Sequence, residues 1–176
     1  LTQGNFKESD LKGVDLRYAN LSGADLSNAN LSGANMVNVN LSGADLSNAN
    51  LSAANLYKAN IQDANLLEAN LSNVNLNRTN LDEANLRNTD LTTLNLIGVD
   101  LSNKNLTGAN LSGVDFSNQD LTGTILTYAK LSGANLNGVD LSGVDLRNKD
   151  LTGTILSGVD LSNKDLTGTI LTFANL

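Results

Sequence analysis

The hydrophobic residues of this chain recur at every fifth position, without a break, from Leu1 to Leu176. Thirty-two of these positions are Leu, and the other four are Phe6, Met36, Ile61 and Phe116. A strict period of five matches neither the 3.6-residue period of a helix nor the two-residue alternation of a long strand. The pattern therefore predicts a repeat architecture in which each five-residue unit forms one structural element.

The residues before each leucine are restricted as well. The position two before the leucine, called here the inward column, is Ala in fifteen of thirty-five units, Val in eight and Thr in five. Residues two apart in an extended segment point to the same side, so this column and the leucine are expected to face a narrow interior. The position directly before the leucine, called here the outward column, is Asn or Asp in thirty-one units. These side chains hydrogen-bond nearby backbone and favour turns.

The two residues after each leucine are typical of a turn. The first is Ser or Thr in twenty-two units, and the second is Gly in fourteen and Asn in nine. Gly and Asn tolerate a positive φ, which suits the third residue of a type II turn. If each turn rotates the chain by about a right angle, four units close a coil of twenty residues, and the chain forms about nine coils. The identical segments 21–30 and 41–50 agree with a twenty-residue coil.

Units such as ADLSN, ANLSG and VDLSG resemble the A(D/N)LXX signature of the pentapeptide-repeat family. The resemblance covers the whole chain. It implies an all-β fold, a right-handed quadrilateral parallel β-helix with a ladder of Leu and Phe side chains inside. It says little about function, because some members resemble DNA in shape and charge and bind gyrase, while most have no assigned activity.

Composition limits the organisation of the chain. Residues 1–176 are expected to form a single solenoid domain, excised from or trimmed within a longer chain, since no linker divides the repeat and the first residue is Leu rather than Met. The chain lacks Pro, as suits a backbone that needs nearly every amide for bonding between coils. No apolar stretch approaches the length of a membrane span. Both ends have the character of open β-coils, which suggests either missing flanking domains or end-to-end stacking, and allows a homo-oligomer. The compartment is not predicted.

The chemistry of the side chains argues against catalysis. There is no His, Cys or Trp, and thirteen of the eighteen acidic residues are Asp of the outward column. Asn takes the same column eighteen times and can neither transfer a proton nor hold a cation as Asp does, so a turn-fastening role is favoured. The evenly spaced glycines lack the lysine of a phosphate-binding loop. We therefore expect no enzyme activity, no catalytic residue, no cofactor and no metal.

Three functions remain in consideration. The first is a rigid scaffold, spacer or protein-interaction module. The second follows from the net charge of −7, which allows an acidic DNA mimic that binds DNA gyrase. The third is an ice-binding solenoid that orders water on a row of hydroxyl groups, namely Ser32, Ser52, Ser72, Thr92, Ser112, Ser132 and Thr152.

One corner of the coil is expected to bind another protein. Wrapping the sequence in twenties places bulky apolar, aromatic and basic residues where other corners have Ser and Gly. A contiguous row of such residues is typical of a partner surface. The alternative is that stacking of Tyr57 on Val37 only stabilises the rod. We call this set the corner strip; it comprises Arg17, Tyr18, Val37, Tyr57, Lys58, Arg78 and Ile97.

Four long polar residues interrupt the inward column. They are Lys104, Gln119, Lys149 and Lys164. Burying an unpaired ammonium group is very unfavourable, so we expect the local corner to differ and to rotate these side chains outward. Ile125, Ile155 and Ile170 of the outward column are likewise expected to mark altered corners. The segments that carry these lysines repeat every fifteen residues, so Lys104 and Lys149 lie on different sides of the rod and form no nucleic-acid groove.

Overall fold

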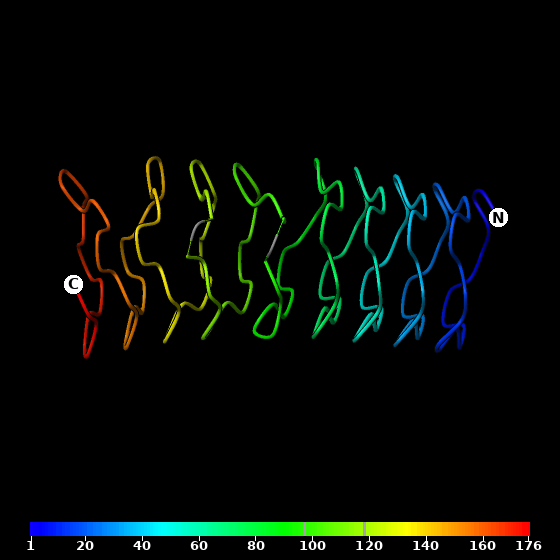
Figure 1. Cartoon of the computed structure of the whole chain (residues 1–176), viewed down its shortest axis with the longest axis horizontal. Coiled ribbons are helices and arrows are strands. Elements are labelled where there is room, and N and C mark those ends of the chain that lie inside the picture. The colour runs from blue at the N-terminus through cyan, green and yellow to red at the C-terminus, as the bar shows by residue number, and fades with distance from the viewer. Residues whose placement is uncertain (97, 118) are drawn as a thin grey trace.

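The chain winds into a rod of stacked coils with its two termini at opposite ends (Figure 1). The computed structural model describes residues 1–96, 98–117 and 119–176. In these ranges the backbone consists of turns and isolated parallel bridges, with neither a helix nor a strand longer than one bridge residue. Accordingly, the described part of the chain offers no helix fit to cross a membrane.

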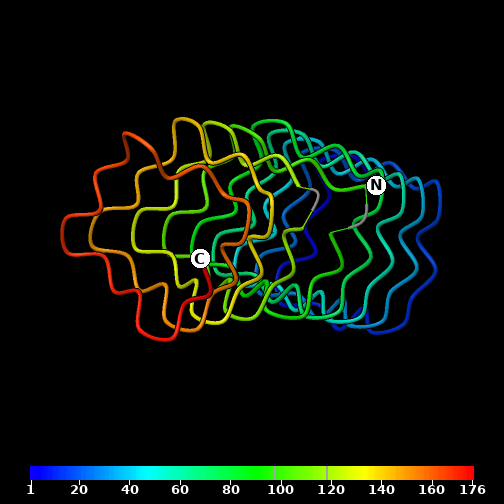
Figure 2. The same cartoon turned by 60° about the vertical axis from the view of Figure 1, so that its left-hand side comes forward.

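Parallel bridges give the length of one coil. They join outward-column residues twenty positions apart, beginning with Asn5–Asp25 and ending with Ile155–Asn175. The chain therefore passes four five-residue units before it returns over itself, and this confirms the predicted twenty-residue coil. Figure 2, which looks more nearly along the rod, shows that successive coils follow nearly the same outline.

The predicted turn recurs along the described residues, with an exception at Thr93, which lacks the positive φ. In the turn 21–24, the Ala24 amide donates to the Leu21 carbonyl at 3.0 Å, and Gly23 has a φ of +64°. Other side chains accept the same left-handed position, for example Tyr18 at +61° and Lys58 at +56°. The Gly23 amide then donates to the Ser42 carbonyl of the following coil at 2.9 Å. The turns thus stack on one another as the units do.

The outward column fastens these turns. The Asn20 Oδ1 atom accepts a hydrogen bond from the Ser22 amide at 3.1 Å, and the same contact recurs along the chain. Neighbouring coils are also joined side chain to side chain, as where the Asn65 Nδ2 atom donates to the Asp45 Oδ1 atom at 3.0 Å. Asn and Asp therefore serve the same structural purpose in this column.

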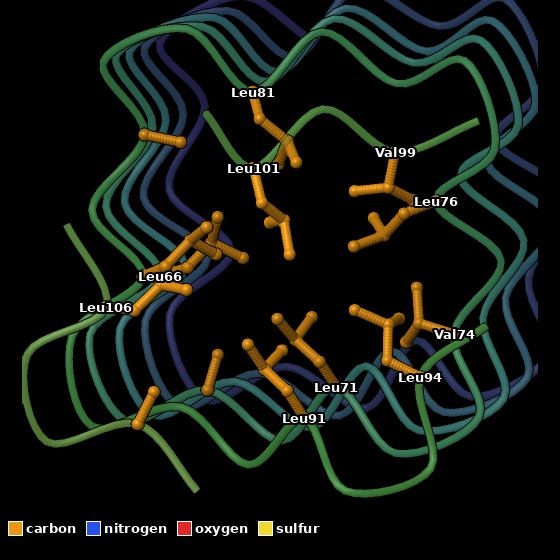
Figure 3. Close-up of a cluster of buried hydrophobic side chains, with 14 of the residues drawn as sticks. Leu66, Leu71, Val74, Leu76, Leu81, Leu91, Leu94, Val99, Leu101 and Leu106 are labelled. Carbon is orange, nitrogen blue, oxygen red and sulfur yellow. The ribbon is translucent and has the colours of Figure 1, made fainter. Parts of the chain in front are cut away.

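The core is the ladder of leucines, assisted by the small inward column. Leu46 and Leu66 are fully buried, as are Met36, Ile61 and Phe116. In the close-up, Leu71 lies beside Leu91 and Leu81 beside Leu101, so each side chain contacts its equivalent in the next coil (Figure 3). Burial of one such side chain is worth about 1.5–3 kcal/mol. The stability of the rod therefore comes mainly from repeated, identical apolar contacts.

The inward-column lysines do not rotate outward, which corrects the expectation from sequence. The backbone at Lys149 keeps the ordinary turn, because its amide donates to the Leu146 carbonyl at 3.3 Å and Asn148 keeps a φ of +55°. Lys149 is only 8% exposed. The corners at Ile125, Ile155 and Ile170 are not altered either, since each of these residues still forms its bridge to the preceding coil.

The lysines change the bridging between coils instead of the turn. Among the described residues, the bridges next to each lysine are missing: Asn80–Asp100 and Asn85–Asn105 at Lys104, Ile125–Asp145 and Lys130–Asp150 at Lys149, and Asp140–Asp160 and Asp145–Asp165 at Lys164. Like charge is not the cause, because Asp25–Asp45 and Asp120–Asp140 are bridged. Two of these lysine side chains contact the preceding coil: the Lys104 Nζ atom pairs with Asp82, and the Lys164 Nζ atom donates to the Leu141 and Val144 carbonyls.

Candidate interaction surfaces

The corner strip is continuous across successive coils, as the wrapped sequence predicts. The backbone hydrogen bonds that stack its turns run from the Tyr18 amide to the Val37 carbonyl, from Asn38 to Tyr57 and from Lys58 to Asn77, at 3.0, 3.0 and 3.1 Å. The next runs from the Arg78 amide to the Gly98 carbonyl, at 3.1 Å. Ile97 lies outside the described residues. The other six members therefore line one corner of the rod.

Exposure differs along the strip. Tyr18 is 75% exposed, although it occupies the left-handed turn position that glycine usually takes. Arg17, Lys58 and Arg78 are exposed, whereas Val37 and Tyr57 are half-buried. The half-buried pair forms the floor of the strip, and the basic and aromatic side chains project from it.

The cations of the strip differ in the groups that they contact. The Arg17 guanidinium makes a two-point contact with Asp15, with its Nη2 atom 2.7 Å from Oδ2 and its Nε atom 2.9 Å from Oδ1. These hydrogen bonds lower the pKa of the Asp15 carboxyl. Lys58 instead lies over an aromatic ring, with its Nζ atom 5.3 Å from the centroid of Tyr57. Such a contact orients the lysine while it keeps its charge available to a partner.

The carboxylates of the outward column are engaged with their own turns. The pKa of Asp140 is lowered chiefly by its hydrogen bond to the Ser142 side chain and then by its bond to the Ser142 backbone amide. Asp115 and Ser117 repeat this arrangement. Within the part of the chain that the structure describes, no three potential metal ligands come together. The arrangement indicates a structural role for these carboxylates.

A second surface feature was not foreseen from the sequence. A pocket of about 710 Å³ opens between segments 127–132 and 145–150, where two bridges are missing beside Lys149. We call it the Lys149 pocket; the side chains that matter for its chemistry are Tyr128, Lys130, Asp145, Arg147, Lys149 and Asp150. The sequence hinted at this pocket by placing Lys149 in a column of small residues. The direction of the Lys149 side chain, however, depends on the spacing between the coils.

The expected end-to-end contact remains a prediction. Leu1 and Leu176 are 65% and 71% exposed, and the other ladder leucines of the first and last coils are half-buried, whereas those of the middle are buried. Apolar ladder residues are therefore accessible at both ends of the described rod.

Four five-residue units per coil around a leucine ladder define a β-helical repeat protein, or β-solenoid. Two family models match this chain: "Pentapeptide repeats", in eight copies over residues 1–33, 105–138 and 134–172, and "Pentapeptide repeat region", over residues 44–116. The chain belongs to the pentapeptide-repeat family.

Solved structures agree with this assignment. HetL, a pentapeptide repeat protein involved in heterocyst differentiation regulation from the cyanobacterium Nostoc sp. strain PCC 7120, is 31% identical. The match covers 99% of this chain and 87% of HetL, with a TM-score of 0.51. A trypsin-treated variant of QnrB1, a plasmid-mediated fluoroquinolone resistance protein, is 18% identical over 97% of this chain and 86% of that one, with a TM-score of 0.53. The second likeness shows the fold alone. Among curated proteins, no sequence matches the chain.

Proposed function

We propose that this protein is a non-catalytic rigid scaffold or spacer that binds another protein along the corner strip. Support comes from the exposed Tyr18 beside the stacked, half-buried Val37 and Tyr57, since aromatic residues with an apolar floor are typical of interface centres. We further infer a right-handed, four-sided helix of about nine coils, by similarity to the family and from the twenty-residue coil. Such a rod presents its surface residues in fixed register.

The partner is expected to offer an apolar surface edged with acidic groups. Lys58 and Arg78 give the strip exposed positive charge on a molecule whose net charge is −7. Opposite charges across an interface accelerate association and fix orientation more than they add affinity. An acidic partner would therefore be attracted to the strip and repelled by the rest of the acidic rod.

The strip is tested by replacing some of its members with serine. Tyr18→Ser and the double variant Tyr57→Ser/Ile97→Ser should each weaken capture of the partner by at least about tenfold, because aromatic anchors carry much of an interface's binding free energy. The measurement is a quantitative pull-down from the source cells, followed by titration of the captured protein against each variant. The melting temperature of each variant is recorded beside it.

Tyr128→Ser is the matched control, because Tyr128 is 83% exposed but lies on a different corner. The control should bind the same partner as the unchanged protein does. Equal capture by all variants, or loss of stability with intact binding, would favour a purely structural role for the strip, and failure to capture any protein would contradict the scaffold proposal.

The DNA-mimic alternative has less support from the charges. Three carboxylates are neutralised by cations on the same rod, in the pairs Asp15–Arg17, Asp82–Lys104 and Asp145–Arg147. Similarity to QnrB1 supports the shared fold only. Inhibition of gyrase supercoiling by near-stoichiometric protein would replace the scaffold proposal with the mimic, so this assay accompanies the pull-down.

A further inference from the structure

The three inward-column lysines differ in how their ammonium groups are satisfied. The Lys164 Nζ atom donates to the carbonyls of Leu141 at 2.6 Å and Val144 at 3.3 Å. The Lys104 Nζ atom is paired with the Asp82 Oδ1 atom at 3.2 Å. Lys149 is 8% exposed, yet among the described residues its Nζ atom has neither a hydrogen bond nor an ion pair. Within the described residues, this Nζ atom is not one of the buried side-chain polar atoms that lack a partner, so it reaches solvent. The pKa of the Asp145 carboxyl is lowered first by hydrogen bonds from Arg147 and in smaller part by the charge of Lys149.

The space into which Lys149 projects has the size of a ligand site. Small-molecule pockets usually measure about 300–1,000 Å³, and the Lys149 pocket measures about 710 Å³. Its ends are closed by intact hydrogen bonds between the coils, from the Gly123 amide to the Ser142 carbonyl at 3.0 Å and from the Gly133 amide to the Thr152 carbonyl at 2.8 Å. The opening is therefore confined to one side of one coil.

The charges around the pocket favour a monoanion. Lys130, Arg147 and Lys149 carry three positive charges and Asp145 and Asp150 two negative ones, which leaves a formal charge of +1. Arg147 is already occupied, because its Nε and Nη2 atoms donate to the two carboxylate oxygens of Asp145 at 2.9 and 2.7 Å. Lys130, which is exposed, and Lys149 are thus the cations available to a ligand. The nearby carboxylates would repel a doubly charged anion such as phosphate.

Apolar groups complete the site. Ala129 and Leu131 line the same pocket, and the ring of Tyr128 stands at its edge, 83% exposed. A ligand with an apolar or aromatic body could cover these groups while its charged end reached Lys149. Ligand pockets commonly combine such a lining with one or two polar groups that fix orientation.

We propose that the Lys149 pocket binds a small organic carboxylate, with the carboxylate on the Lys149 ammonium group and an apolar body against Tyr128 and Leu131. This site is separate from the corner strip and does not depend on the proposed scaffold function. Ligand binding there would couple a small metabolite to the spacing of two coils.

Benzoate is a suitable probe, because it is a monoanion with a flat apolar body. Titration into the whole protein, followed by amide chemical shifts, should give one saturable site with a dissociation constant of about 1 mM, as expected for so small a ligand. The shifts should centre on the amides of Tyr128 and Lys149. Benzamide, the neutral analogue, and inorganic phosphate should each bind at least about tenfold more weakly.

Two variants give the control. Lys149→Met should weaken benzoate binding by at least about tenfold, whereas Lys164→Met should leave it unchanged because that lysine is already satisfied. Lys149→Arg should restore binding to within a few-fold of the unchanged protein, which guards against misfolding as the cause of the loss. Absence of a saturable site, equal affinity for benzamide, tighter binding of phosphate, or full binding by folded Lys149→Met would each overturn the proposal.

Discussion

Each leucine of the five-residue period has its own equivalent above and below it, and this environment explains the restricted composition of the neighbouring columns. Leu46 and Leu66 are fully buried, and Ala24, Ala29 and the other small residues close the interior beside them. A side chain larger than Val rarely fits the inward column, because the next coil lies about 4.8 Å away. Leu94 is an exception; it is buried and lies beside Val74 (Figure 3).

Leu46→Ala should therefore lower the free energy of unfolding by about 2–5 kcal/mol, since it removes buried methyl groups and leaves a cavity. Chemical denaturation of the unchanged protein and of Leu46→Ala measures the difference, and the dependence of the unfolding free energy on denaturant concentration should be the same for both. Leu1→Ala is the control, because Leu1 is 65% exposed and should cost less than about 0.5 kcal/mol. Equal effects of the two substitutions would contradict a buried ladder at the centre and an open one at the end.

At the scale of the coil, the bridging between neighbours depends on the inward column. Where this column holds Ala, as at Ala64, the flanking bridges Asn40–Asn60 and Asp45–Asn65 are present. Where it holds Lys104, Lys149 or Lys164, the corresponding bridges are absent among the described residues. The turn itself is the same in both cases, so one side chain changes the contact between coils without changing its own unit.

Lys104→Ala should restore the contact between its coil and the preceding one. The Leu81 and Leu86 amides would then bond to the carbonyls of Asp100 and Asn105, as equivalent amides do elsewhere, and their hydrogen exchange should slow by about twofold to tenfold. The Leu41 and Leu46 amides, which already bond to Asn60 and Asn65 at 2.7 Å, serve as the internal reference.

The reciprocal change tests the same explanation. Ala64→Lys should accelerate exchange at Leu41 and Leu46, because the new side chain would separate the two coils that these amides join. Unchanged exchange in both Lys104→Ala and Ala64→Lys would show that side-chain length in the inward column does not control coil spacing.

For the whole molecule, the abundant aspartates affect stability through their ionisation. The pKa values of Asp115, Asp140 and Asp160 are lowered below the usual 3.8, first by hydrogen bonds from the serine side chain two residues on and then by its backbone amide. A carboxyl whose pKa is lower in the folded state contributes stability above its unfolded pKa. That contribution is lost as the pH falls through the lower, folded value.

The melting temperature should accordingly change little from neutral pH to about pH 5 and fall below about pH 4. Calorimetric scans across this range measure the change. The triple variant Asp115→Asn/Asp140→Asn/Asp160→Asn should show a shallower fall, since Asn keeps the acceptor oxygen of the turn but does not titrate. An identical fall in the variant would mean that these carboxylates are not responsible.

Of the two candidate surfaces, the sequence could predict the one formed by the regular repeat and not the one formed where the repeat is interrupted. The strip from Arg17 to Arg78 could be assembled from the sequence, because a constant twenty-residue coil fixes which turns lie above one another. The Lys149 pocket could not, because the sequence did not show whether a lysine among small residues turns out or interrupts the bridges between two coils. Lys104 and Lys164 share its column and context, yet each finds a partner that Lys149 lacks.

The sequence by itself determined the five-residue unit, its turn, the inward leucine ladder and the twenty-residue coil. These features are local or strictly repeated, so the same steric and hydrogen-bonding requirements apply in every unit and can be recognised in the sequence. The tertiary structure alone decided where, among the described residues, the bridges between neighbouring coils are lost and which lysine faces a pocket without a hydrogen bond. Those outcomes depend on competition between the burial of a charge and the contact between two coils, and residues twenty apart must be brought together before that competition exists.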